Sequence, residues 1–172
     1  MGIIAIDFRS WGMRAGLAAA ALAAGCVSAD LSTDTKATAN VIEALPTDTP
    51  APAAIARAIW YPNARGFGTT GASPLGRATG VLALAGSKLW FMAWNGEERH
   101  YDMLHDVDVL TALTVSIDWA GPSAMLVIQS RTHAYDAFEL MNGGQFTSDP
   151  KATQALVDQI EALRAKHPQA DL

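Results

Sequence analysis

Cysteine is almost absent from this chain, since Cys26 is the single one among 172 residues. One thiol cannot form a disulfide within the chain, so packing and hydrogen bonds must hold the fold together. Positive charge is scarce as well, because 12 lysines and arginines stand against 17 aspartates and glutamates. Nucleic acids and anionic lipid surfaces are bound by clustered cations, so this balance argues against both as partners.

Long hydrophobic runs are also lacking. The apolar run at residues 15–25 has eleven residues, whereas a membrane-spanning helix needs about 20. Arg14 precedes the run and small residues end it, which is typical of a secretory signal peptide. We therefore predict that residues 1–25 are a leader that is removed, and translation from Met13 would make this leader compact.

The end of the leader, residues 22–26, resembles the lipobox of bacterial lipoproteins, with Ala23 where that signal prefers leucine. The resemblance implies cleavage before Cys26, a diacylglycerol on its thiol and an acyl chain such as palmitate on its new amino group. It implies a protein anchored in the bacterial cell envelope and facing the periplasm. Val27 stands where aspartate would favour the inner membrane, so the outer membrane is expected. The alternative is a lone buried cysteine in a core helix.

The remaining chain divides by composition. Residues 26–54 are rich in Ala, Thr, Asp and Pro, and we predict a flexible tether in which residues 32–45 form at most a weak helix. Residues 55–167 are predicted to be one folded domain. Without the leader the charged residues number 10 basic and 16 acidic, a net charge of −6, because Arg9, Arg14 and Asp7 are lost.

The folded part has the pattern of antiparallel strands followed by one helix. Gly86 separates two apolar runs and predicts a hairpin, and Asn95-Gly96 predicts a two-residue type I′ turn. Asp149 as a cap, Pro150 at the first position and a stripe of Leu156, Ile160 and Leu163 predict a C-terminal helix that ends before Pro168. The predicted strands cover residues 81–84, 89–94, 98–104, 107–119, 125–128 and 135–140.

This order of elements resembles pleckstrin-homology-like domains. Residues 80–84 followed by 89–91 resemble the glycine-led opening of the GRAM-type members. The resemblance implies a bent antiparallel barrel of about six or seven strands capped by the helix, which serves as a platform for lipids, peptides or proteins. The first hairpin offers Lys88 alone as a cation, so a phosphoinositide headgroup is not expected there.

Few residues suggest catalytic chemistry. His100, Asp102 and His105 could supply nitrogen and oxygen ligands to a metal ion, but they match no fixed ligand spacing, and ordinary surface charge is the preferred interpretation. Ser130, His133 and Asp136 lack the G-x-S-x-G elbow of a serine hydrolase. We therefore predict no catalytic residue, metal or cofactor.

Aromatic residues offer a candidate binding surface instead. Trp60 and Tyr61, just before Pro62, lie outside the clearest strands, and exposed aromatic anchors dominate binding energy. The sequence thus predicts a lipid-anchored, non-catalytic binding or scaffolding lipoprotein. Two alternatives remain open: a small metal-dependent hydrolase or metalloprotein using His100, Asp102 and His105, and a structural subunit of the cell envelope that works through exposed aromatics.

Overall fold

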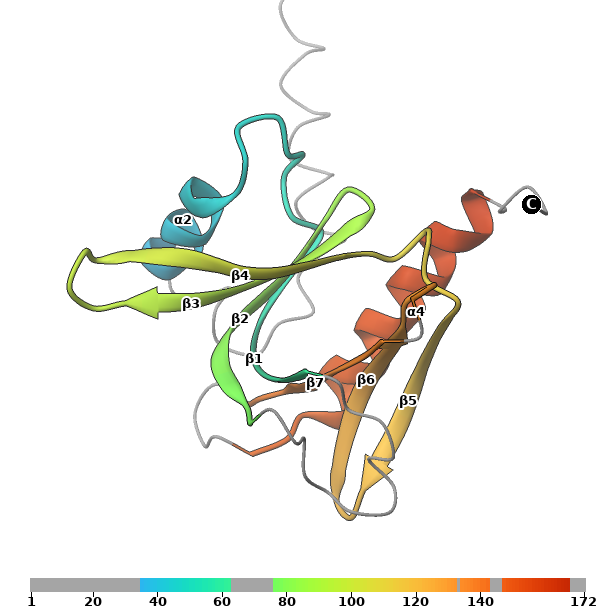
Figure 1. Ribbon diagram of the computed structural model, residues 1–172. Coiled ribbons are helices and arrows are strands. Elements are labelled where there is room, and N and C mark those ends of the chain that lie inside the picture. The colour runs from blue at the N-terminus through green and yellow to red at the C-terminus, as the bar shows by residue number, and fades with distance from the viewer. Residues whose placement is uncertain (1–34, 63–75, 133, 143–146, 168–172) are drawn as a thin grey trace, which may run out of the picture.

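The computed structural model describes residues 35–62, 76–132, 134–142 and 147–167 (Figure 1). Seven antiparallel strands form one open sheet, followed by a C-terminal helix, so the predicted fold class is confirmed. Across the sheet the order is β4-β3-β2-β1-β7-β6-β5. The elements are α2 (Thr35–Ala44), β1 (Ala54–Pro62), β2 (Ala78–Ala85), β3 (Lys88–Asn95), β4 (His100–Asp108), β5 (Thr114–Ala120), β6 (Ser123–Gln129), β7 (Tyr135–Leu140) and α4 (Pro150–Lys166).

The sheet bends at β1, which belongs to both of its halves. Residues 54–60 of β1 pair with β2, and residues 58–62 pair with β7. In Figure 1 the strands β3 and β4 therefore run at a steep angle to β5 and β6, and β4 and β5 are the two edges of the sheet. We call the concave face, against which α4 packs, the inner face, and the opposite face the outer face.

The main core lies on the inner face, under α4. The largest fully buried side chains there include Leu82, Phe91, Leu126, Phe138 and Ile160, which come from four strands and the helix. Each such side chain contributes roughly 1.5–3 kcal/mol relative to an exposed one. The packing of α4 therefore stabilises the half of the sheet that β5, β6 and β7 form.

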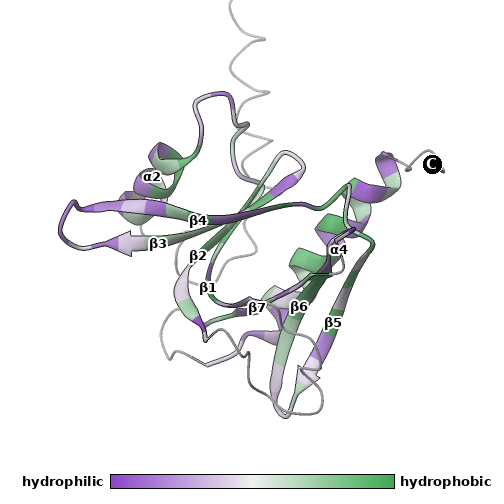
Figure 2. Cartoon of the chain, in the orientation of Figure 1, coloured by the Kyte–Doolittle hydropathy of each residue, from purple (hydrophilic) through white to green (hydrophobic). Residues whose placement is uncertain are grey.

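The helix α4 begins and packs as the sequence predicts. The Asp149 carboxylate accepts a hydrogen bond from the Ala152 amide at 3.0 Å, and Pro150 occupies the first turn. Leu156 and Ile160 are buried against the sheet. Figure 2 shows the corresponding apolar stripe on the side of α4 that faces the strands.

The described part of the predicted tether belongs to the folded domain, which corrects the expected boundary at residue 55. Residues 35–44 form α2, and Val41 is fully buried against the outer face. Leu45 joins it in a second cluster with Trp90 and Met92 of β3. Composition suggested a solvated segment, but Val41 within the helix and Leu45 directly after it are enough to hold α2 on the sheet.

Two local features shape the sheet. Gly80 adjoins the last pair of the β2–β3 ladder, Val81 with Met92, and approaches β3 closely: a Cβ atom at this residue would lie 2.1 Å from the Met92 carbonyl oxygen. In β4, His105 pairs with Phe91 and Met103 pairs with Met92, which leaves Leu104 as an extra residue in a β-bulge. The bulge keeps His105 on the inner face although Met103, two residues away, faces outward.

Three expectations about local structure were wrong. The predicted strand at residues 107–119 is broken by a turn, in which the Asp108 carboxylate accepts from the Leu110 amide at 3.0 Å. The apolar pattern continued through this turn because Val109 and Ala112 are themselves buried in the main core. Residues 54–62, not predicted as a strand, form β1.

The Asn95-Gly96 turn also differs from its prediction. A four-residue loop, 96–99, connects Asn95 to its partner His100. The Asn95 side-chain oxygen accepts from the Glu97 and Glu98 amides, at 3.1 and 3.2 Å, and the positive φ falls on Arg99, at 57°. The Asn side chain thus stabilises a longer loop than a type I′ turn. Gly86, by contrast, takes the expected positive φ of 62°.

Candidate functional site

Trp60 and Tyr61, the predicted binding surface, are packed inside the domain rather than exposed. Adjacent residues of a strand point to opposite faces, so Trp60 lies on the inner face and Tyr61 on the outer face. Trp60 is partly buried, and Tyr61 is only 9% exposed. The error arose because β1 was not predicted as a strand, so both rings were expected to lie outside the sheet.

Trp60 belongs to a polar cluster that links three strands across the inner face. Its indole nitrogen donates to one oxygen of the buried Asp136 carboxylate at 2.9 Å. The other oxygen lies 3.0 Å from Nε2 of His105. The His105 ring stacks on Trp60 with a centroid distance of 4.6 Å. Each partner of the carboxylate is therefore held by both a hydrogen bond and a ring contact, which indicates a structural role.

Tyr61 makes a second buried polar contact, on the outer face. Its hydroxyl donates to the Glu139 carboxylate at 3.0 Å, and Glu139 is 8% exposed. Burial raises the pKa of the Tyr61 hydroxyl above its ordinary value of 10.0, and the nearby Glu139 charge raises it further, against an opposing effect of Arg77. Tyr61 therefore acts as a neutral donor that satisfies a buried carboxylate.

The three proposed metal ligands are not brought together, because His105 lies apart from the other two. His100 lies 2.6 Å from the Asp102 carboxylate, whereas His105 binds Asp136. Asp102 also accepts from the Asn95 amide at 3.0 Å, which completes its contacts within the hairpin. Within residues 35–62, 76–132, 134–142 and 147–167, no three His, Cys, Asp or Glu side chains gather as metal ligands would.

Lys88, the single cation of the first hairpin, is already paired. Its Nζ lies 2.8 Å from the Asp106 carboxylate and 4.9 Å from the centroid of the Trp90 ring. The hydrogen bond to Asp106 raises the pKa of Lys88 above 10.5. Its ammonium is therefore engaged by the protein's own carboxylate.

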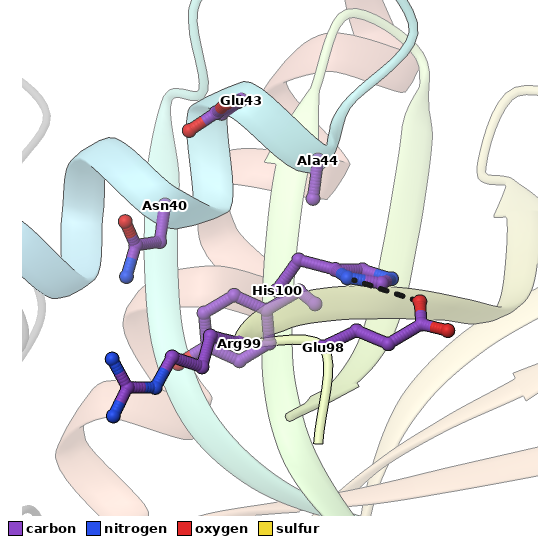
Figure 3. A pocket seen from close by; sticks show the side chains of 7 residues that line it. Asn40, Glu43, Ala44, Glu98, Arg99 and His100 are labelled. Atoms are coloured by element: carbon purple, nitrogen blue, oxygen red, sulfur yellow. Dashed lines mark ion pairs between the residues drawn. The ribbon is translucent and has the colours of Figure 1, made fainter. Parts of the chain in front are cut away.

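A hollow of about 500 Å³ lies between α2 and the turn that joins β3 to β4. Helix α2 supplies Asn40, Glu43 and Ala44, and the turn and the start of β4 supply Glu98, Arg99, His100 and Tyr101. In Figure 3 the His100–Glu98 pair lies on one side, and the Asn40 amide and the Arg99 guanidinium lie on the other. Volumes of about 300–1,000 Å³ are typical of small-molecule sites.

No protein-family model and no curated protein matches this chain. The function must therefore be argued from its own residues.

The shape of the hollow depends on α2. Asn40, Glu43 and Ala44 are spaced three and four residues apart, so they lie on one helical face. Val41 and Leu45 fix this helix on the outer face of the sheet, which places the lining residues opposite the β3–β4 turn. The weak helix expected within residues 32–45 is present as α2, but sequence reasoning missed the site because it placed this helix in a tether rather than on the sheet. The periodic Val41 and Leu45 were the available signal.

Arg99 lines the hollow with a strained backbone. Its φ of 57° lies in the left-handed region, where a residue with a Cβ atom is disfavoured by about 1–2 kcal/mol. Its amide donates to the Asn95 carbonyl at 2.8 Å, so the loop geometry imposes this conformation. The loop therefore presents a long cationic side chain at a position that glycine would fill more easily.

Exposed tryptophans occur elsewhere. Trp94 is 48% exposed on β3, where its ring meets the edge of Tyr101 at 5.1 Å between centroids. Trp119 is 57% exposed on β5, an edge strand. Among the residues that the structure describes, Trp94 and Trp119 are the exposed tryptophans, and they, rather than Trp60 and Tyr61, offer aromatic side chains to a partner.

Two of the candidates from the sequence lie outside the described residues, namely Cys26 with its leader and His133. Ser130 is described, and its hydroxyl lies 2.8 Å from that of Thr132. Asp136 is committed to Trp60 and His105. Among the described helices, none is long and apolar enough to cross a membrane.

Proposed function

We propose that this chain is a lipid-anchored lipoprotein of the bacterial cell envelope whose pleckstrin-homology-like domain binds a ligand without transforming it. The leader and Cys26 support the anchoring. The sheet of seven antiparallel strands followed by a helix supports the relation to pleckstrin-homology-like domains. Folds of this kind host many functions, so the proposal depends on the site rather than on the architecture.

The hollow between α2 and the β3–β4 turn is the observation that carries the binding function. It brings together polar side chains from two separate elements around an open space. The histidine–carboxylate pairs, by contrast, are committed to one another or to buried partners. A site that recognises a ligand fits this arrangement better than a site that performs acid–base chemistry.

The short segment between Cys26 and α2 limits how far the hollow can lie from the membrane in this proposal. Nine residue steps separate Cys26 from Thr35, which begins α2. A chain of that length spans at most about 32 Å when fully extended. A lipid on Cys26 therefore keeps the hollow near the membrane surface, which favours a ligand found in or near the envelope.

The anchor is tested by the intact mass of the membrane-extracted protein, compared between wild type and Cys26→Ser. We expect wild-type protein cleaved before Cys26 that carries a diacylglycerol and acyl chains, and a variant that carries no lipid. An unmodified wild-type chain that retains Met1 or Met13 would remove the anchoring part of the proposal.

The binding function is tested by native mass spectrometry of the gently extracted protein. Wild type is expected to carry a small-molecule adduct, and Asn40→Trp, which fills the hollow, is expected to lose it. Gln154→Trp, an exposed amide on α4, is the matched control and should keep the adduct. Absence of any adduct from wild type, or its retention in Asn40→Trp, would contradict binding in the hollow.

A structural subunit of the envelope is the second candidate, and the exposed Trp119 favours it. An edge strand offers unpaired backbone groups to another chain, and an exposed tryptophan beside them is a strong anchor. A photo-crosslinker placed at residue 119 in living cells should then give one defined protein adduct, and one at Glu161 should give none. Equal crosslinking at both positions would remove this candidate.

A further inference from the structure

Charges of both signs line the hollow without neutralising each other. The Glu43 carboxylate comes from α2 and the Arg99 guanidinium from the β3–β4 turn. Both side chains are exposed, and neither forms a hydrogen bond or an ion pair with another side chain in the described part of the chain. A cation and an anion that share a hollow but do not pair leave space between them for a third group.

Two further titratable side chains that line the hollow, Glu98 and His100, already have partners. His100 lies 3.5 Å from Glu98 and 2.6 Å from Asp102. The Asp102 carboxylate also accepts from the Asn95 amide at 3.0 Å. This chain of contacts occupies the side of the hollow that Figure 3 shows around Glu98 and His100. The groups left to meet a ligand are therefore the Arg99 guanidinium, the Glu43 carboxylate and the Asn40 amide.

We infer that the hollow binds a zwitterion that carries an anionic group and a primary ammonium. Arg99 and Asn40 donate hydrogen bonds to the anionic group, and Glu43 accepts hydrogen bonds from the ammonium. A ligand with only one charged group would leave either Arg99 or Glu43 unmatched. The Tyr101 ring and the Ala44 methyl group provide the apolar surface against which the carbon atoms between the two charges pack. This inference rests on the proposed binding function and specifies its ligand class.

The backbone of Arg99 supports a role in recognition. A residue held at a positive φ costs free energy that glycine would avoid, and such strain concentrates at functional sites. Asn40 and Glu43 are one helical turn apart on α2, so one ligand can reach both. Charge-assisted hydrogen bonds are about twice as strong as neutral ones, so these contacts can select between ligands at an open site.

The test is a calorimetric titration of the extracted protein with four probes. O-phosphoethanolamine carries both charges, ethanolamine only the cation, inorganic phosphate only the anion, and phosphocholine a cation without N–H donors. We expect O-phosphoethanolamine to bind about tenfold more tightly than each of the other three. Equal affinity for a probe with one charge would overturn the inference.

Variants identify which residue recognises which end. Arg99→Gln should abolish the preference for O-phosphoethanolamine over ethanolamine, and Glu43→Gln should abolish its preference over phosphate. Lys151→Gln and Glu161→Gln are controls at exposed positions of α4, and they should keep both preferences. Arg99→Gly repeats the test in a loop freed of strain. A general loss of affinity without these selective changes would contradict the assigned roles.

The same chemistry is offered by a free metabolite and by a lipid headgroup. Sedimentation of the mature chain, residues 26–172 with Cys26→Ser and without the apolar leader, with vesicles of phosphatidylethanolamine and phosphatidylcholine separates these sources. Binding to these vesicles but not to pure phosphatidylcholine identifies a headgroup, and binding of soluble O-phosphoethanolamine alone identifies a free zwitterion. Equal binding to both kinds of vesicle would overturn the selectivity for a primary ammonium.

Failure of this inference is distinguishable from failure of the proposed function. An adduct that Asn40→Trp removes, in a protein that shows no preference for O-phosphoethanolamine, leaves the binding function intact and rejects the zwitterion. Absence of an adduct, together with absence of binding by all four probes, rejects both.

Discussion

At the scale of single residues, Gly80 determines how closely β2 and β3 approach. A Cβ atom at this position would lie 2.1 Å from the Met92 carbonyl oxygen and 2.9 Å from Cζ of Phe91. Neither the backbone of β3 nor a fully buried ring can move away freely. The glycine is therefore required by the close approach of two strands and not by a turn.

Gly80→Ala should lower the free energy of unfolding by about 3 kcal/mol or more, because the added methyl group overlaps the backbone. Urea unfolding measures this change. Gly96→Ala is the control: nothing lies within 4 Å of the place where its Cβ atom would stand, so we expect a change within about 0.5 kcal/mol. Similar effects of the two substitutions would show that the strands separate more easily than the structure indicates.

Tyr61 predicts a dependence of stability on alkaline pH. Its pKa in the folded protein lies above 10.0 because burial and Glu139 disfavour the phenolate. The folded state therefore holds its proton to higher pH than the unfolded state does. This contribution to stability is fully present below pH 10.0 and is lost as pH rises through the folded pKa.

Tyr61→Phe removes this titration, so its stability should fall less steeply than that of wild type as the pH rises beyond 10.0. The measurement is the free energy of unfolding on either side of that pH, for both proteins. Parallel pH profiles would mean that the phenol titrates alike in the folded and unfolded states.

At the scale of elements, α2 is held by one face only. Val41 is fully buried and its neighbour Ile42 is 49% exposed. Val41→Ala should therefore destabilise the protein by about 1–2 kcal/mol, whereas Ile42→Ala should change stability by no more than about 0.5 kcal/mol. Chemical denaturation of both variants is the check. Equal effects would show that α2 does not contribute to the cooperative unit.

Much of the sheet could be predicted because its local signals agree with its tertiary contacts. Gly86 and Asp149 occupy positions where backbone geometry or capping demands their chemistry. The strand β1 was missed because its small residues, such as Ala56 and Ala58, carry little pattern of their own. These alanines are buried because β1 lies in the middle of the sheet, between β2 and β7.

The candidate site was harder to predict for a related reason. Its lining residues come from segments more than fifty positions apart, and no local pattern in α2 points to the β3–β4 turn. The turn itself contained a misleading signal, since Asn95-Gly96 is typical of a shorter loop. Only the packing of Val41 on the outer face brings Asn40 and Glu43 opposite Arg99.

At the scale of the whole molecule, the cluster of Trp60, His105 and Asp136 joins the two halves of the bent sheet. β4 and β7 are separated by three strands in the sheet order, yet His105 reaches Asp136 across the inner face. The Asp136 side chain is 11% exposed. The contact therefore connects an edge strand with the centre of the molecule.

Asp136→Ala should cost about 2–3 kcal/mol, because it leaves the Trp60 indole and His105 without their acceptor. Asp102→Ala is a matched control: this carboxylate also binds a histidine and an amide, but its side chain is 46% exposed. Its loss should cost less than about 1 kcal/mol. Thermal and urea unfolding should agree on this order, and the reverse order would refute the role of burial.

Leu104, the extra residue of the bulge in β4, makes this strand tolerant of one change in length. Its removal would leave Met103 paired with Met92 and His105 paired with Phe91, so each side chain would keep its face. Removal of Asp106 instead would close the bulge by placing Leu104 opposite Phe91 on the inner face and His105 opposite Trp90 on the outer face, where His105 no longer reaches Asp136. A single-codon deletion is therefore expected to be accepted at Leu104 and to be costly at Asp106, which makes the bulge the natural site of length variation in the strand.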